Sequence, residues 1–184
     1  VTRKYGIQPL IGLEMTLIID EKAISFRFLA LSTKGYQELM KLSTLKMTGR
    51  NNWSDFTSHL EDVAVIVPYF NGVEQMDLGH DYFIGVSPDT PQEVFTKPIL
   101  PLYLVNSFSK EDLQVLQILS AIKDNVSLRE VDVHSQQGIF LPASELEARF
   151  ENSFPQALAN LQDLIKNVSY QIDPSLKLPR FNPE

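Results

Sequence analysis

Cysteine is absent from this sequence of 184 residues. The absence excludes disulfides and thiolate metal sites, and it is typical of proteins from reducing compartments. The sequence also lacks an apolar run long enough to span a membrane, and it does not open with the basic and apolar regions of a signal peptide. We therefore expect a cytoplasmic protein without a membrane partner.

The motifs that mark common catalytic and nucleotide-binding sites are also missing. The sequence contains no G-x-S-x-G nucleophile elbow, and it contains neither of the phosphate loops G-x-G-x-x-G and G-x-x-x-x-G-K. Lysine and arginine are scattered rather than grouped with aromatic residues, and the net charge is −7. Because a surface of this sign repels phosphate backbones, we expect no nucleic-acid-binding residues here.

Metal-binding patterns are weak. The three histidines, His59, His80 and His134, lack the spacing of a metal-binding helix, and we interpret them as solvated loop residues. Glu14 differs because it stands in the apolar run "IGLEMTLII", where a buried carboxylate would need a metal or a cation. The residues alone leave two interpretations open for Glu14, a solvent-facing strand position and a metal ligand.

Hydrophobic patterning indicates a mixed α/β fold with a helical C-terminal end. A short polar connection, "DEK", joins the first two predicted strands as a hairpin. The predicted strands cover 10–20, 23–32, 63–70, 81–88 and 99–105, and the predicted helices cover 33–47, 109–124, 144–150 and 153–168.

Two of these helices have recognisable N-cap residues and a row of apolar residues at helical spacing. Thr33 is the expected cap of the first helix, whose buried stripe is predicted to hold Tyr36, Leu39 and Met40. Ser109 and Asp112 form a predicted capping box in the second. The apolar stripe of that helix is predicted to contain Val115, Ile118, Leu119 and Ile122.

Four segments resemble a known family in their order and spacing. They are "QPLIGLEM", "LALSTKGYQELMKLST", "SFSKEDLQVLQILSAIKDN" and "FPQALANLQDLIKNV". Together they are similar to the PHP (polymerase and histidinol phosphatase) domain of the bacterial DNA polymerase III alpha subunit. The resemblance covers nearly all of residues 6–181, and "GYQELMKL" and "FPQALANL" are its most specific parts.

The resemblance implies an incomplete, distorted (β/α)7-type barrel. The family's first strands would precede Val1, so residues 1–173 are expected to be a PHP domain that lacks them. Residues 174–184 are expected to begin a linker towards the polymerase palm. Since the chain opens on Val1 and ends with "LPRFNPE", we expect a piece of a longer protein.

The resemblance also identifies positions of lost metal ligands. The family's D-V-H-Y pattern falls on "LVNS", which places Leu104 at the aspartate position and Asn106 at the histidine position. Glu14 matches a third ligand position. Leucine cannot coordinate a metal, and a neutral amide is a poor substitute for imidazole. We therefore expect vestigial ligand positions at Glu14, Leu104 and Asn106, with no metal, no cofactor and no catalytic residue in this chain.

The expected function is that of a non-catalytic, structural PHP domain in a replicative polymerase. The parent chain would synthesise DNA with Mg²⁺ in its palm domain, and this segment would contact that palm and the thumb. DNA would be reached only through the parent. The alternatives are a metal-dependent phosphoesterase or 3′–5′ proofreading exonuclease, and a free-standing small-molecule-binding α/β domain. Without the family's first strands, strand 10–19 would present an open edge. We expect the isolated fragment either to self-associate through this edge or to cover it with a terminal segment, and we favour self-association.

Overall fold

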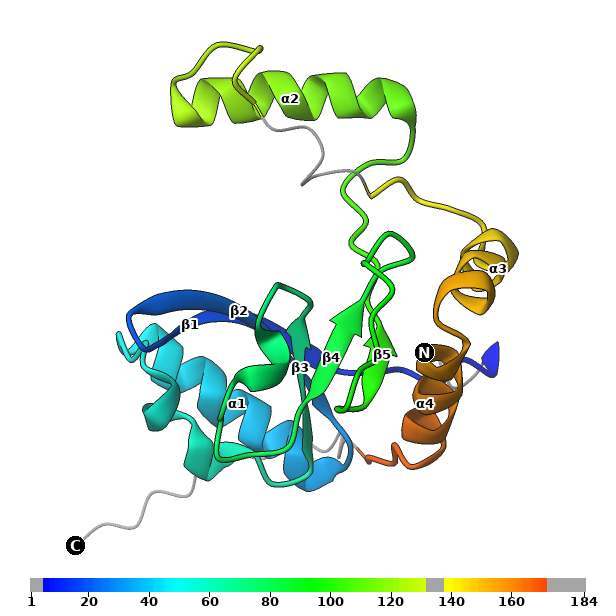
Figure 1. Cartoon of the computed structure of the whole chain (residues 1–184). Coiled ribbons are helices and arrows are strands. Elements are labelled where there is room, and N and C mark those ends of the chain that lie inside the picture. The colour runs from blue at the N-terminus through cyan, green and yellow to red at the C-terminus, as the bar shows by residue number, and fades with distance from the viewer. Residues whose placement is uncertain (1–4, 132–137, 172–184) are drawn as a thin grey trace, which may run out of the picture. The chain divides into compact units, whose positions relative to one another are not determined.

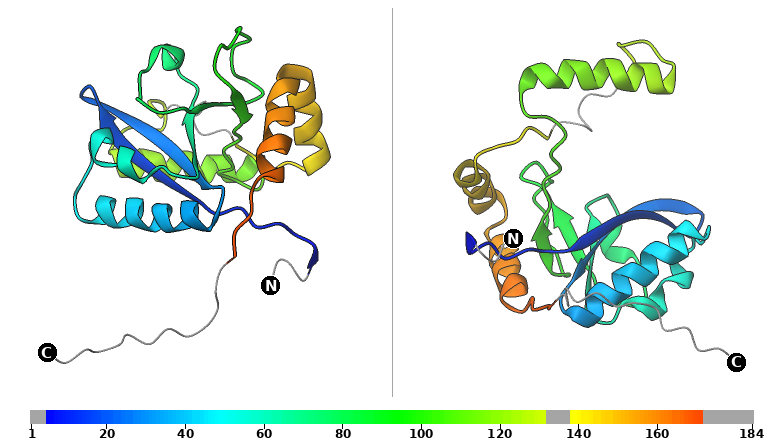
Figure 2. Two further views of the ribbon diagram at one scale, coloured as in Figure 1. Left: turned by 90° about the horizontal axis from the view of Figure 1, so that it is seen from below. Right: turned by 180° about the vertical axis from the view of Figure 1, so that it is seen from behind.

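The computed structural model describes residues 5–131 and 138–171 (Figures 1 and 2). These residues form five strands, four α-helices and three short 3-10 helices, which confirms the predicted mixed α/β class. The chain divides into two compact units. The described part of the first unit is 5–67, 77–82 and 164–171, and that of the second is 68–76, 83–131 and 138–163. Within the described part, no helix is both long and apolar enough to cross a bilayer.

The first unit opens with the predicted β-hairpin. Strands β1 (Gly12–Ile19) and β2 (Lys22–Ala30) pair in antiparallel fashion. Asp20 and Glu21 alone connect them, with φ angles of 46° and 65°. Both residues therefore have the left-handed conformation of a two-residue type I′ turn, whose twist matches that of the strands it joins. Figure 1 shows the hairpin as a long twisted ribbon.

Aromatic side chains of β2 form the centre of this unit's core. Phe26 and Phe28 are fully buried on one face of the strand, as the alternation predicts. Both rings stack on Trp53, with centroid separations of 4.8 Å and 6.5 Å. The Trp53 indole N–H donates a hydrogen bond of 2.9 Å to the carbonyl of Leu78. The core thus pairs large apolar area with a satisfied polar group.

Further elements of the first unit enclose this core. Strand β3 (Val63–Pro68), whose last residue belongs to the second unit, pairs antiparallel with β2 and places Val65 opposite Phe28. The loop before it contains the 3-10 helices η2 (Trp53–Asp55) and η3 (Thr57–His59).

Helix α1 (Thr33–Met47) packs along the hairpin, but its buried side differs from the prediction. The residues that face the core are Gly35, Glu38, Leu39 and Leu42. Of the predicted stripe Leu39 is confirmed, whereas Met40 is 49% exposed. The cap is also displaced by one residue, because the Ser32 hydroxyl, and not that of Thr33, accepts the N–H of Gly35.

A close backbone approach explains the orientation of α1. A Cβ atom at Gly35 would lie 2.1 Å from the carbonyl oxygen of Asp62, so only glycine fits. Asp62 also accepts two hydrogen bonds from the residues before the helix. Its carbonyl accepts the Leu31 N–H at 2.9 Å, and its carboxylate accepts the Ser32 hydroxyl at 2.6 Å. Asp62 therefore fixes the start of α1 and which of its sides is buried.

The second unit has two parallel strands and most of the helical residues. Strand β4 (Phe83–Val86) pairs with β5 (Ile99–Pro101), and Ile84 lies opposite Ile99. Helix α4 (Pro155–Lys166) is tied to β5 because the Asn160 side-chain amide donates to the Ile99 carbonyl at 2.9 Å. The other elements of this unit are η4 (Val73–Gln75), α2 (Lys110–Asp124) and α3 (Ala143–Ser153).

The capping signals of these helices were predicted with mixed success. The Ser109–Asp112 capping box at α2 is confirmed. Helix α3 instead begins at Ala143 after Pro142, without a side-chain cap, so the predicted start at Ser144 is wrong. Pro142 is the N-cap, with φ −55° and ψ 142°, and its carbonyl accepts the N–H groups of Glu145 and Leu146 at 3.0 Å and 3.1 Å.

The apolar stripe predicted for α2 is exposed. Leu113 and Leu116 are half-buried and Ala121 is buried, so the other side of the helix contacts its own chain. The exposed fractions of Val115, Ile118, Leu119 and Ile122 are 55%, 45%, 55% and 71%.

The predicted strand 99–105 is too long, and its last part contains Leu104, one of the predicted ligand positions. β5 ends at Pro101, and Leu104 and Asn106 lie in irregular backbone beyond it. The (β/α)7-type barrel is not confirmed either, because β2 pairs antiparallel with β1 on one side and with β3 on the other, and only a two-residue turn joins β1 to β2. Residues 174–184 and His134 lie outside the described residues.

The outer edge of β1 is partly occupied. The Lys46 ammonium donates to the Thr16 carbonyl at 2.6 Å, and the Ile18 N–H donates to the Asn51 carbonyl at 2.7 Å. These contacts cover the C-terminal half of the strand with groups from α1 and the following loop. Self-association through strand 10–19 stays a prediction. The part of its edge from Leu10 to Glu14 lies outside these contacts and is where another strand would pair.

We predict that Gly35→Ala destabilises the protein by about 1–3 kcal/mol, the usual range for forced overpacking. This sign is opposite to the usual effect of glycine-to-alanine changes inside helices, which stabilise by about 0.5–1 kcal/mol. The reason is the 2.1 Å approach of the new Cβ to the Asp62 carbonyl oxygen. Chemical denaturation would measure the change, with Ser43→Ala on the same helix as the control. A more stable Gly35→Ala variant would show that the contact relaxes freely.

Candidate functional site

Glu14, the first predicted ligand position, lies on the solvent-facing side of the hairpin. Its side chain is 57% exposed, and its carboxylate Oε1 lies 3.0 Å from Nη2 of Arg27, directly across on β2. The Ser25 hydroxyl donates to the same oxygen at 3.4 Å. The solvent-facing interpretation of Glu14 is therefore correct, and Arg27 supplies a counter-charge.

Leu104 and Asn106 belong to the second unit, where backbone contacts hold their loop. The carbonyl of Gly138 accepts the N–H groups of Asn106 and Ser107 at 2.7 Å and 3.1 Å. A Cβ at Gly138 would lie 1.3 Å from the Leu104 carbonyl oxygen, so the two backbones cross at a glycine. Leu104 is 51% exposed. The loop is thus fixed by main-chain hydrogen bonds.

Metal-binding geometry is lacking throughout the residues that the structure describes. Within 5–131 and 138–171, no group of three or more histidine, aspartate or glutamate side chains could hold a metal ion. Glu14 lies in the first unit, and Leu104 and Asn106 lie in the second.

Glu38, which was not predicted as a site residue, is the most buried charged group among the described residues of the first unit. Its side chain is 3% exposed, and it carries three basic neighbours. The ammonium of Lys41 donates to Oε1 at 2.9 Å, and Nδ1 of His59 lies 2.9 Å from Oε2. Lys34 is 3.6 Å from Oε1. The solvated-loop interpretation of His59 is wrong, because its ring is half-buried against this carboxylate.

Electrostatics keeps Glu38 ionised. The hydrogen bond from Lys41 lowers the pKa of Glu38, burial opposes it, and His59 and Lys34 lower it further, with a net change from 4.5 to about 2. An ionised carboxylate only accepts hydrogen bonds, so the proton between the two side chains resides on Nδ1 of His59. The sequence contains a sign of this ion-paired carboxylate, because Lys34 and Lys41 stand four residues before and three residues after Glu38. Gly35 stands three residues before Glu38.

An open, mainly apolar hollow lies beside this network. It has a volume of about 560 Å³, and its lining residues are Gln37, Met40, Lys41, Thr44, Leu45 and His59. An imidazole oriented by a carboxylate is half of a general-base arrangement. The lining supplies no carboxylate, serine or cysteine, and its hydroxyl, Thr44, donates to the Met40 carbonyl within the helix at 2.9 Å. The network therefore stabilises the packing of α1 against η3.

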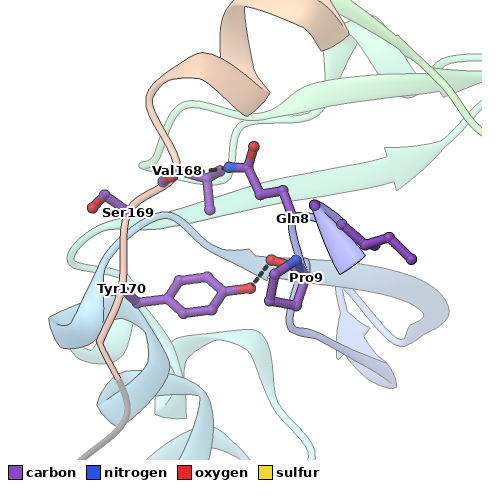
Figure 3. A pocket seen from close by; sticks show the side chains of 7 residues that line it. Gln8, Pro9, Val168, Ser169 and Tyr170 are labelled. Carbon is purple, nitrogen blue, oxygen red and sulfur yellow. Dashed lines mark hydrogen bonds between the residues drawn. The ribbon is translucent and has the colours of Figure 1, made fainter. Parts of the chain in front are cut away.

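A second hollow lies where the two ends of the first unit meet (Figure 3). The Gln8 amide donates to the carbonyls of Ile165 and Val168 at 3.2 Å and 3.1 Å, and the Tyr170 hydroxyl donates to the Pro9 carbonyl. The cavity measures about 330 Å³ and has no charged residue in its lining. Because the Gln8 and Tyr170 side chains hold the two segments together, this site has a structural role.

In the second unit, hydrogen bonds shift the pKa values of Glu74 and Tyr69. The Glu74 carboxylate accepts the N–H groups of Thr96 and Lys97 at 2.6 Å and 3.3 Å, which lowers the pKa of Glu74. The Tyr69 hydroxyl donates to Glu93 at 2.9 Å, which raises the pKa of Tyr69. Both contacts bridge segments of this unit that are far apart in the sequence.

We predict that Glu38→Gln destabilises the protein by about 1–3 kcal/mol at neutral pH, the usual loss when a buried hydrogen-bond network is broken. The folded-state pKa of Glu38 lies below its unfolded value. Its contribution is thus complete above about pH 4.5 and is lost as the pH falls towards about 2. As the pH is lowered from 6 to 2, the melting temperature of Glu38→Gln should fall less steeply than that of the unsubstituted protein. Glu61→Gln, which removes an exposed charge near the same Lys34, is the control, and equal slopes in both variants would contradict the assignment.

Comparisons with known proteins identify relatives over nearly the whole chain, although it matches no protein-family model. The DNA polymerase III subunit alpha of Streptococcus pyogenes serotype M1 is 36% identical over 182 residues, which are 98% of this chain and 18% of that protein. The subunit of the same name from Halalkalibacterium halodurans is 22% identical over 216 residues, which cover 97% of this chain and 19% of that protein. The chain thus spans about a fifth of the length of these curated relatives. It is homologous to a segment of the bacterial DNA polymerase III alpha subunit.

Proposed function

We propose that this chain is a non-catalytic, structural PHP domain within a longer DNA polymerase III alpha subunit. The homology to a segment of such subunits supports the replicative role. The resemblance to the PHP pattern supports the domain assignment, in which residues 1–173 form a PHP domain without its first strands and residues 174–184 begin a linker.

One observation carries the non-catalytic part of the proposal. Leu104 and Asn106 occupy the aspartate and histidine positions of the D-V-H-Y pattern. An aliphatic side chain provides no lone pair, and a neutral amide oxygen is a weak ligand for a transition metal. Glu14, the third position, is neutralised by Arg27 at 3.0 Å. The metal-dependent phosphoesterase and the proofreading exonuclease are therefore less well supported.

The structural role rests on how each unit is held together. In the first unit, the stacked rings of Phe26, Phe28 and Trp53 and the ionised Glu38 network provide a rigid core. In the second, Asn160 bonds α4 to β5. A fixed core with its polar groups used internally suits a module that supports other domains. The free-standing small-molecule-binding domain is less well supported. In the hollow lined by Gln8, the Gln8 side-chain amide donates to backbone carbonyls of the chain itself and so serves the fold.

In the proposed parent protein, this domain contacts the palm and thumb of the same polypeptide. Nucleotide addition takes place in the palm, where Mg²⁺ supplies the metal-ion chemistry, and the protein acts in the cytoplasm. With a net charge of −7, the domain itself does not hold DNA, which is bound elsewhere in the parent.

The metal content of the chain tests this proposal. We expect residues 1–184 to retain no stoichiometric zinc or manganese after dialysis against a chelator, as measured by elemental analysis. In the full-length polypeptide, we expect Glu14→Gln to leave any phosphoesterase activity unchanged. One bound transition metal per chain, or loss of a hydrolytic activity on Glu14→Gln, would contradict the non-catalytic role.

A separate expectation concerns nucleic acid. We predict no measurable binding of single- or double-stranded DNA by residues 1–184 at about 0.15 M salt, because the negative surface repels phosphates and gains nothing from counterion release. Fluorescence anisotropy with a labelled oligonucleotide would measure this. A micromolar dissociation constant would show that a local basic surface outweighs the net charge.

A further inference from the structure

The open hollow beside α1 contains a hydrogen-bond acceptor that the fold leaves unused. Its lining comes from α1 and from η3, to which His59 belongs. Nδ1 of the His59 ring lies 2.9 Å from Oε2 of the buried Glu38, so the ring edge that carries Nε2 faces away from this carboxylate. Among the residues that the structure describes, Nε2 has no hydrogen-bond partner.

The tautomer of His59 follows from the ionisation of Glu38. An ionised carboxylate only accepts hydrogen bonds, so the proton of the neutral imidazole resides on Nδ1. Nε2 then carries a lone pair that accepts a hydrogen bond. A ligand that pairs with this atom needs an O–H or N–H donor, which a carboxylate or a phosphate dianion lacks.

The surrounding charges favour a neutral ligand. Lys41, the charged residue of the lining, donates to Oε1 of Glu38 at 2.9 Å. Lys34 lies 3.6 Å from the same oxygen and 3.5 Å from Oε2 of Glu61. The two lysines and the two glutamates balance, so these residues offer neither an anion nor a cation an unpaired counter-charge.

The apolar part of the lining favours an aromatic ring. Met40 is 49% exposed and Leu45 is half-buried. A methionine sulfur makes favourable contacts with aromatic rings, and an ammonium such as that of Lys41 is attracted to a ring face. An aliphatic alcohol lacks both contacts, and its O–H is a weaker donor than that of a phenol. The volume of about 560 Å³ is typical of small-molecule sites.

We propose that this hollow binds a small neutral phenol, whose hydroxyl donates to Nε2 of His59 while its ring packs against Met40 and Leu45. His59 then contacts Glu38 through Nδ1 and the ligand through Nε2. The contact with Glu38 fixes the imidazole before the ligand arrives, which reduces the entropy lost on binding. The site lies in the first unit and does not depend on the proposed polymerase role.

An NMR titration of residues 1–184 with phenol tests the proposal, and anisole is the matched control. Anisole keeps the ring but replaces the hydroxyl by an ether, which cannot donate. We expect phenol to shift the Met40 methyl and His59 ring signals along a saturable curve, and anisole to bind about fivefold more weakly, as the loss of one hydrogen bond implies. Equal affinities, or shifts that do not saturate, would overturn the proposal.

Ligands of either charge test the electrostatic part. Benzoate and benzylamine carry a carboxylate and an ammonium on the same ring, and we expect both to bind more weakly than phenol. Tighter binding of either one would show that the hollow has an unpaired charge and would overturn the assignment of a neutral ligand.

The variant His59→Asn separates ligand binding from folding. The asparagine amide supplies an N–H for Glu38 in place of Nδ1, whereas nothing replaces Nε2. His80→Asn makes the same change at a half-buried histidine outside the lining and is the control. We expect phenol affinity to fall about fivefold in His59→Asn and by less than about twofold in His80→Asn. Full affinity in a folded His59→Asn would refute the role of Nε2, and the comparison of phenol with anisole decides the matter if this variant does not fold.

Discussion

The contact between Gly35 and the backbone of Asp62 determines how the first unit is built. Glycine allows α1 to lie against the Asp62 carbonyl, and the residues before the helix hydrogen-bond to the same aspartate. This contact turns α1 so that Glu38 faces inward. The buried carboxylate must then be paired, and Lys41, Lys34 and His59 supply the positive charge. One steric constraint therefore decides the helix orientation, the burial of a charge and the role of a histidine.

In the second unit, main-chain contacts hold the loop that contains Leu104 and Asn106. Gly138 lets the two backbones cross, and its carbonyl holds the N–H groups of Asn106 and Ser107. Leu104 and Val105 of this loop are apolar and exposed. A loop that is anchored by main-chain groups does not need a metal for its conformation.

The candidate site was predictable only in part. The proposal that Leu104 and Asn106 stand at former ligand positions rests on residue types that the sequence shows directly. The environment of Glu14 was not, because an alternating strand pattern does not reveal which cross-strand neighbour will meet a side chain. Arg27 became that neighbour through the hairpin register. Glu38 was overlooked because a charged residue within a helix is normally assigned to the solvent side.

Local patterns in the sequence determined the type of each element: the hairpin, the four helices, the capping box at Ser109 and the mixed α/β class. These features depend on residues that are close along the chain, so their signals are complete within short windows. Tertiary structure alone decided the rotation of α1, the early end of β5 at Pro101 and the exposure of the stripe on α2. Each of these depends on which distant backbone or side chain lies opposite, and hydrophobic periodicity identifies an apolar face without identifying its partner.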